Sequence, residues 1–385
     1  MLGPSVFALR RQLRAVAVVV GLVAALAALV GPATAAPTAN RFDQINVVSD
    51  LPGVAPILDP LLVNPWGLAL SPTSPLWVAN NGTGTATLYR GDGGGTPFVK
   101  VALEVTVTNG APTGQVFNGT TSFQVPTPLG PRPAVFIFDS QAGDITGWNP
   151  ANGTTAVVAA HSDDAIYTGL ALLQTPSGPF LLAADFRHAR IDVFDGNWNR
   201  VNVGSAFTDP ALPSGYAPFN VQVLGGAVYV AYALQGEGGE EEVAGHNLGF
   251  VDKYTDFGQT VERIASRGNL NAPWGLAIAP GSFGKYAGAL LVGNFGDGKI
   301  GAYADNGDFL GFLRDRNNDV LSIDGLWALL PGTAASGGTD AVWFSAGPDE
   351  ETHGLVGIIR PLGNAMSSGI ILRLFPIASH HRNQF

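Results

Sequence analysis

The chain has 385 residues, no Cys and a formal net charge of −10. Without Cys it can form no disulfide, use no thiol nucleophile and bind no metal through thiolates. Its acidic balance argues against nucleic acid and anionic membranes as partners. Gly (51 residues) and Pro (27 residues) are so frequent that long helices are excluded, because Gly weakens a helix and Pro ends it.

Residues 1–36 predict a secretory signal peptide. Arg10, Arg11 and Arg14 form a basic n-region, residues 15–30 are apolar, and ATAA at residues 33–36 fits a small-residue cleavage site. An uncleaved anchor helix and a twin-arginine signal remain as alternatives. Cleavage removes three Arg and no acid, which changes the net charge to −13. We therefore expect an exported protein, extracellular or periplasmic, with no stable membrane span after cleavage.

One segment recurs about two hundred residues later: NPWGLAL at residues 64–70 returns as NAPWGLAI at residues 271–278. Aligning the chain on the residue that opens each such apolar run gives a period near fifty residues. The six aligned positions are Gly67, Gly119, Gly169, Phe219, Gly275 and Gly325. A period near fifty that contains only strand-like runs indicates propeller blades rather than a helical solenoid.

The third repeat shows the expected strands of one blade. They are an inner strand at residues 169–173, a second at 180–184, a third at 190–194 and an outer strand at 200–204. The first two are almost wholly apolar, as expected for strands packed between neighbouring blades. The sequence thus predicts an all-β fold over residues 42–361, a six-bladed β-propeller with four-stranded antiparallel blades.

The last repeat has no obvious outer strand. Residues 42–48 alternate apolar and polar side chains and precede the first repeat, so we expect them to pair with the last blade and close the ring. Residues 370–375 are the competing candidate for this position. Apart from that segment, residues 362–385 are expected to be a C-terminal tail.

Several motifs together resemble a known family. They are NPWGLA at residues 64–69, FNGT at 117–120, and the segments at residues 186–195, 245–252 and 345–354. The chain resembles an uncharacterised family of secreted bacterial six-bladed β-propeller proteins that are NHL-repeat-like. The resemblance covers residues 42–361 and implies a six-bladed propeller and export. It implies no activity, so no catalytic residue follows from it.

Propeller topology predicts where a ligand binds. The links from second to third strand, and from outer strand to the next inner strand, emerge on one face over the central channel. Candidate ligand-binding residues there are Asn118, Asp185, Asn220, Asp324 and Glu351.

The same face carries candidate metal ligands, His188, His246 and His353. Three imidazoles suit zinc, whereas Asp and Asn with backbone carbonyls suit calcium. The alternative is that the Asn and Asp side chains stabilise turns and the histidines are solvated.

The largest insertion, QGEGGEEE at residues 235–242, is expected on that face as a lid, a cation-attracting patch or a solvated loop. Most Trp residues are expected to pack between blades, with Trp198 as the exposed one. Neither a Ser nucleophile elbow nor a phosphate-binding loop is present in the sequence. We expect a monomeric scaffold for a small molecule, glycan or protein ligand. The alternative is a metal-dependent lactonase, hydrolase or lyase with a central divalent cation, and fold alone does not choose between them.

Overall fold

The computed structural model describes residues 40–255 and 257–362. The predicted signal peptide and most of the predicted tail, including residues 370–375, lie outside these ranges. The described chain is all-β, with short 3-10 turns at Asn81–Thr83, Pro150–Asn152, Glu237–Gly239 (η3) and Gly284–Tyr286. This confirms the predicted all-β fold class. Among the described residues, no helix is long and apolar enough to cross a membrane.

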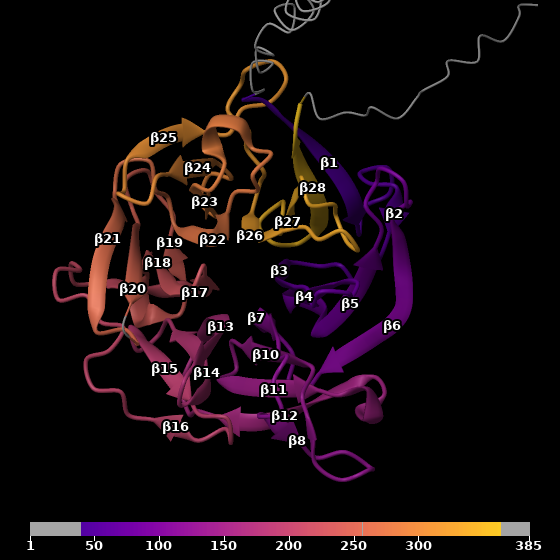
Figure 1. Ribbon diagram of the computed structural model, residues 1–385, viewed down its shortest axis with the longest axis vertical. Coiled ribbons are helices and arrows are strands. Elements are labelled where there is room, and N and C mark those ends of the chain that lie inside the picture. Colours follow the sequence, from indigo (N-terminus) through magenta and orange to yellow (C-terminus); the bar gives the residue numbers. More distant parts are fainter. Residues whose placement is uncertain (1–39, 256, 363–385) are drawn as a thin grey trace, which may run out of the picture. The chain divides into compact units, whose positions relative to one another are not determined.

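The strands form radial sheets, shown in Figure 1. An eight-stranded sheet has the order β3 (Pro65–Ala69), β4 (Leu76–Asn80), β5 (Thr85–Arg90), β6 (Val99–Val107), β12 (Thr155–His161), β11 (Asp144–Trp148), β10 (Phe136–Ser140) and β7 (Pro112–Phe117). It consists of two antiparallel four-strand runs joined where β6 and β12 pair in parallel.

Three further sheets follow along the chain. The first is β13 (Tyr167–Thr175), β14 (Gly178–Asp185), β15 (Arg190–Phe194) and β16 (Arg200–Val201). The second is β17 (Tyr216–Leu224), β18 (Ala227–Gln235), β20 (Phe250–Thr255) and β21 (Thr260–Ser266), with β19 (Glu242–Val243) paired to β18. The third is β22 (Pro273–Ile278), β23 (Leu290–Asn294), β24 (Ile300–Tyr303) and β25 (Phe309–Phe312).

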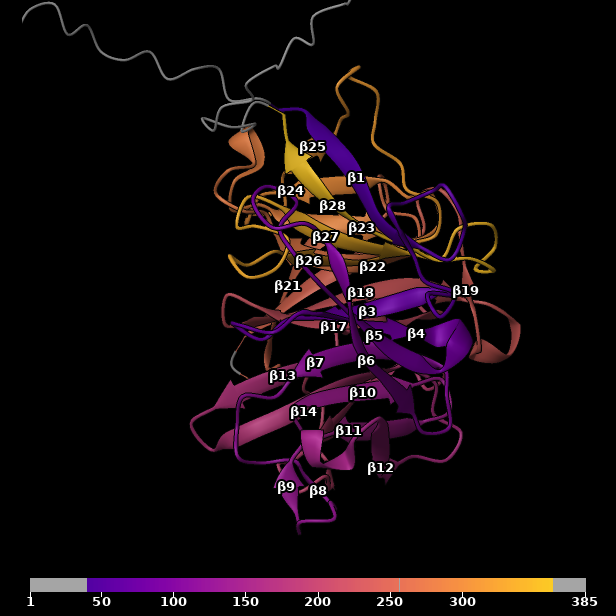
Figure 2. The same cartoon turned by 90° about the vertical axis from the view of Figure 1, so that its right-hand side faces the viewer.

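The last sheet is closed by the N-terminal strand. Its order is β2 (Ile57–Leu58), β1 (Phe42–Ser49), β28 (Leu355–Pro361), β27 (Val342–Ala346) and β26 (Leu326–Pro331). The pairing of β1 with β28 is antiparallel and confirms the prediction that the N-terminal strand completes this sheet. A separate small hairpin, β8 (Gln124–Val125) with β9 (Arg132–Pro133), projects beyond β11 and β12 in Figure 2.

The innermost strands surround a common axis, as in a β-propeller (Figure 1). They contact one another in the cyclic order β3, β7, β13, β17, β22, β26 and back to β3. Glycine makes this approach possible: a Cβ on Gly67 would overlap the Thr113 carbonyl, and one on Gly114 would overlap the Leu170 amide. Of the glycines that mark the repeats, Gly67 and Gly275 are therefore needed because the backbone of the neighbouring inner strand lies against them.

Two strand predictions are wrong. The inner strand of the second repeat is Pro112–Phe117, so Gly114 rather than Gly119 lies against the neighbouring strand. Asn118, expected at the start of this strand, directly follows its last residue. The outer strand of the third repeat spans Arg200–Val201 and not residues 200–204. It ends early because the side chain of Asn202 accepts a hydrogen bond from the Gly204 amide at 2.9 Å, and Gly204 has a φ of 63°.

Aromatic side chains fill the centre. Trp66, Trp274 and Trp327 come from three inner strands and lie together with Phe219. Trp66 stacks on Trp327 with 3.6 Å between ring centroids, and Trp274 meets both edge-on. The axis that the inner strands surround is therefore filled by an apolar core.

Trp198, predicted to be exposed, is half-buried. Its ring meets Phe123 edge-on, and its Nε1 donates to the Gln124 carbonyl at 2.7 Å. This prediction is wrong because the β8–β9 hairpin supplies a partner for the indole.

Candidate functional site

The insertion between β18 and β20 connects three neighbouring sheets. At its start Gln235 Nε2 donates to the Phe186 carbonyl at 2.7 Å, and Glu240 pairs with Arg187, so this half is held by the link between β14 and β15. At its end the Gly245 amide donates to the Asn271 side chain at 2.6 Å, just before β22. The insertion is thus anchored on both sides to the face that the sequence predicts as the ligand-binding face.

Carboxylates from this insertion lie near one on the last sheet. Burial, with the charges of Glu351 and Glu241 adding to it, raises the pKa of Glu242 to about 7. Burial also raises the pKa of Glu351, the charge of Glu241 raises it further, and a hydrogen bond from Asn64 opposes the rise. The insertion and the β27–β28 link therefore present like charges to one another. We call this set, Glu241, Glu242 and Glu351, the acidic cluster.

The backbone that carries Glu351 is strained. Asp349, Glu350 and Glu351 have consecutive φ values of 57°, 54° and 64°, in the left-handed region that non-glycine residues avoid at a cost of roughly 1 kcal/mol or more each. The turn is held because the Asp349 amide donates to Asp324 Oδ2 at 3.0 Å. Asp324 and Glu351, two predicted ligand-binding residues, are thus brought to the same turn.

The acidic cluster is linked to the aromatic core through Asn64. Its Nδ2 donates to Glu351 Oε2 at 2.6 Å, and its Oδ1 accepts from Trp327 Nε1 at 3.0 Å. Phe295, from the β23–β24 link, stacks on Trp327 with 4.1 Å between centroids. A polar surface built on a rigid aromatic floor is well suited to holding side chains in fixed positions.

The other predicted ligand-binding residues are satisfied inside the protein. Asn220 is buried, with Nδ2 donating to the Trp274 carbonyl at 2.7 Å. Asn118 donates to the Ser122 and Ala134 carbonyls at 3.1 and 2.8 Å, beyond the opposite end of its strand. Asp185 is fully buried, and its partners are His188 in the link that follows β14 and Arg190 in β15. The structure does not bring these three together with Asp324 and Glu351.

The three predicted histidines have separate environments. His188 Nδ1 hydrogen-bonds Asp185 at 2.8 Å, and His353 Nδ1 hydrogen-bonds Asp50 at 2.8 Å. His246 is exposed in the insertion. Within residues 40–255 and 257–362, no group of three or more His, Asp or Glu side chains is placed to hold a metal ion.

Two curated proteins of Acanthamoeba polyphaga mimivirus are similar to the chain along most of its length. Uncharacterized protein R648 is 32% identical over 328 residues, covering 81% of this chain and 78% of that protein. Uncharacterized protein L690 is 32% identical over 321 residues, covering 78% of this chain and 80% of that protein. The chain belongs to their family. Because these relatives are viral and uncharacterised, bacterial origin and export remain predictions from the sequence.

No family model matches the chain. Among solved structures, virginiamycin B lyase from Staphylococcus aureus is similar with a TM-score of 0.44 and 11% identity, covering 83% of this chain and 98% of the lyase. This likeness assigns neither an activity nor a ligand to the chain.

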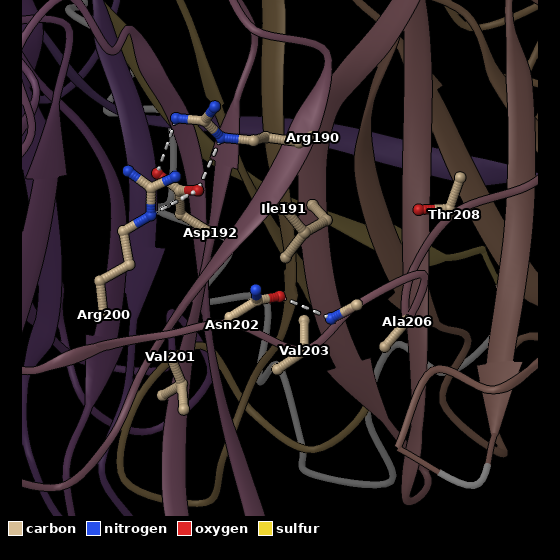
Figure 3. A pocket seen from close by; sticks show the side chains of 10 residues that line it. Arg190, Ile191, Asp192, Arg200, Val201, Asn202, Val203, Ala206 and Thr208 are labelled. Carbon is tan, nitrogen blue, oxygen red and sulfur yellow. Dashed lines mark hydrogen bonds and ion pairs between the residues drawn. The ribbon is translucent and has the colours of Figure 1, made fainter.

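A charged cavity that the sequence did not predict lies beside β15 and β16, as Figure 3 shows. Its volume is about 450 Å³, and two arginines, Arg190 and Arg200, both contact the buried carboxylate of Asp192. The alternation of side chains along a strand could have indicated part of this cavity. Arg190 and Asp192 are two residues apart in a strand, so they lie on the same side of it. The contribution of Arg200 depends on how the hairpin folds.

A second missed feature lies among the inner strands. Gln115 is buried, and neither atom of its side-chain amide has a hydrogen-bond partner among the described residues. It lines a cavity of about 10 Å³ together with Gln222 and Asn220. A space of this size is close to the volume needed for one water molecule.

Proposed function

We propose that this protein is a six-bladed β-propeller with four antiparallel strands in each blade, acting as a binding scaffold. The cyclic contact of the innermost strands supports six blades. The eight-stranded sheet counts as two of them, because the parallel contact between β6 and β12 joins two complete antiparallel runs at their outer strands. In the last blade, β1 takes the place of the outer strand.

We propose that the binding surface is the face around the insertion between β18 and β20. The observation that carries this proposal is that the insertion spans from the β14–β15 link to the segment before β22 and sets its carboxylates near Glu351. Acidic side chains gather there: Glu237, Glu240, Glu241, Glu242, Asp324, Asp349, Glu350 and Glu351. Arg187 lies among them and is paired with Glu240. A ligand that neutralises this surface carries positive charge, such as a basic segment of a protein or a cationic small molecule.

The alternative of a metal-dependent lactonase, hydrolase or lyase needs protein ligands that converge on one ion. His188 and His353 instead pair with different carboxylates, Asp185 and Asp50. The binding scaffold is therefore the function that the geometry supports best.

The test uses hexalysine as a cationic probe. We expect it to bind at low salt, and we expect the double variant Glu241→Gln, Glu350→Gln to bind about tenfold more weakly, since both residues are exposed on this face. The matched control is Asp305→Asn, Asp308→Asn, which makes the same change in charge at the β24–β25 link on the opposite side of the blade. Equal losses in the two double variants, or no saturable binding by the parent protein, would reject this face as the binding surface.

Export and a monomeric state are part of the proposal and rest on the sequence. Pro37 should be the first residue of the mature protein if cleavage follows the ATAA segment. N-terminal sequencing of protein from an exporting host, with light scattering for its mass, tests both statements. A retained segment of residues 1–36 on exported protein would contradict the cleavage.

A further inference from the structure

The cavity beside β15 exists because the outer strand of this sheet is short. The pairing of β16 with β15 consists of Val201 with Val193 and Arg200 with Phe194. Beyond Val201 the chain turns away at Asn202, and no described residue continues this ladder toward Arg190. The upper part of β15 is therefore left as one wall of an open space of about 450 Å³. Ligand pockets in proteins commonly have volumes of this size.

A buried carboxylate positions both arginines at this cavity. Asp192, only 3% exposed, accepts from Arg190 Nε at 2.8 Å and contacts Arg200 Nε at 3.1 Å, as Figure 3 shows. The Tyr167 hydroxyl donates to the same carboxylate at 2.9 Å. Because Asp192 is held from several directions, the two guanidinium groups are oriented before any ligand arrives.

Hydrogen-bond donors are left for a ligand. Two carboxylates, Asp192 and the buried Asp185, match the charges of the two arginines, and Arg190 contacts both of them. Arg200 uses Nε for Asp192, and its side chain is 46% exposed. Among the described residues its terminal nitrogens form no other ion pair. Free guanidinium N–H groups in fixed positions select carboxylate or phosphate oxygens.

The rest of the lining favours a single carboxylate over a phosphate. Ile191, Val203 and Ala206 contribute apolar side chains, and the hydroxyl of Thr208 lies on the far side of the space in Figure 3. A doubly charged phosphate needs uncompensated positive charge, whereas here Asp192 and Asp185 already match the charges of the two arginines. A hydrocarbon body, in contrast, gains from contact with the apolar wall.

We propose that this cavity binds a small organic monocarboxylate. Its carboxylate binds Arg190 and Arg200, and its hydrocarbon part passes the open edge of β15, where β16 has ended, to contact Ile191 and Val203 on the other side of the strand. This site is separate from the acidic face and takes a ligand of opposite charge.

Isothermal titration calorimetry with phenylacetate tests the proposal. We expect saturable binding with one molecule per chain, and we expect Arg200→Gln to weaken it at least tenfold. Since Arg200 is exposed, this variant should retain the fold, which its thermal unfolding checks. Arg132→Gln is the matched control, because Arg132 is an exposed arginine on β9, outside the cavity lining, and it should leave the affinity unchanged.

Two further probes separate the parts of the proposal. We expect 2-phenylethanol, which lacks the charge, and inorganic phosphate, which lacks the hydrocarbon body, to bind at least tenfold more weakly than phenylacetate. If 2-phenylethanol binds as tightly as phenylacetate, the cavity is simply apolar, and if phosphate does so, it is a general anion site. If phenylacetate shows no saturable binding, the cavity is not a binding site for it. Each of these three results would overturn the proposal. Hexalysine binding should be unchanged in Arg200→Gln. The proposed binding at the acidic face and the proposed binding in this cavity are therefore tested independently of one another.

Discussion

The acidic cluster and the arginine cavity hold their charges in opposite ways. Glu241, Glu242 and Glu351 are like charges brought together, so burial and mutual repulsion disfavour their ionised forms. At the cavity, one buried carboxylate lies between two guanidinium groups, so opposite charges stabilise one another. The acidic cluster is therefore stabilised when protons or a cationic ligand neutralise it. The side chains of the arginine cavity, in contrast, are held in position before any ligand binds.

The largest effect is expected from Asp192→Ala. This change leaves two guanidinium groups and the Tyr167 hydroxyl without their shared acceptor. We expect the free energy of unfolding to fall by about 3 kcal/mol. This value is at the lower end of the range for a broken buried ion pair, because both arginines are partly exposed. Urea unfolding of the variant and the parent measures it. Glu241→Gln, which removes a charge from the acidic cluster, is the comparison and should not destabilise. A loss below about 1 kcal/mol in Asp192→Ala would contradict the organising role of Asp192.

A smaller effect is expected from pH at the acidic cluster. The folded pKa of Glu242, about 7, lies above the ordinary carboxyl value of 4.5, so the folded state retains this proton longer than the unfolded state. The stability that this proton contributes is present at acid pH and is lost as the pH rises from about 4.5 to 7. Glu242→Gln should therefore gain stability relative to the parent over that window, on the order of 2 kcal/mol.

The measurement is the difference in free energy of unfolding between the parent and Glu242→Gln at several pH values. Asp139 and Asp252, whose pKa values burial raises to about 7, are present in both proteins, so their contributions cancel. A difference that does not change with pH would show that Glu242 has the same pKa in the folded and unfolded states, which contradicts the prediction.

The smallest effect is expected from Glu351→Gln. The glutamine carbonyl can still accept from Asn64 Nδ2, so the free energy of unfolding should change by less than about 0.5 kcal/mol. Because one of the like charges near Glu242 is removed, the pKa of Glu242 should fall. Carbon-detected NMR titration of the Glu242 side chain measures this fall. An unchanged pKa would show that the two carboxylates do not interact.

Much of the architecture was predictable because repeats and strand periodicity are local. The alternating residues 42–48 and the missing last outer strand were enough to predict the pairing of β1 with β28. The strand at residues 190–194 was predicted with its observed bounds. The inner strand of the second repeat was misplaced because Asn118-Gly119 resembles a repeat start. The glycine that the close approach of two inner strands requires is Gly114. Its contact with β13 identifies it, and the sequence alone does not reveal that contact.

The sites were less predictable, since their partners come from distant parts of the chain. The sequence indicated that the insertion at residues 235–242 shares a face with Glu351, but not that the two interact. For His188 and His353 the residue type suggested a shared metal site, whereas the structure gives each its own carboxylate.

By itself, the sequence determined the all-β class, the repeat length, the closing strand and the face on which the large insertion lies. These follow from turn residues and side-chain alternation, which act over a few neighbouring positions. Only the tertiary structure decided which charges meet: Glu242 with Glu351 across the face, and Arg200 with Asp192 beside a shortened strand. The physical reason is that a charge pair depends on distance in space, and a chain folded into radial sheets brings together residues that its order keeps apart.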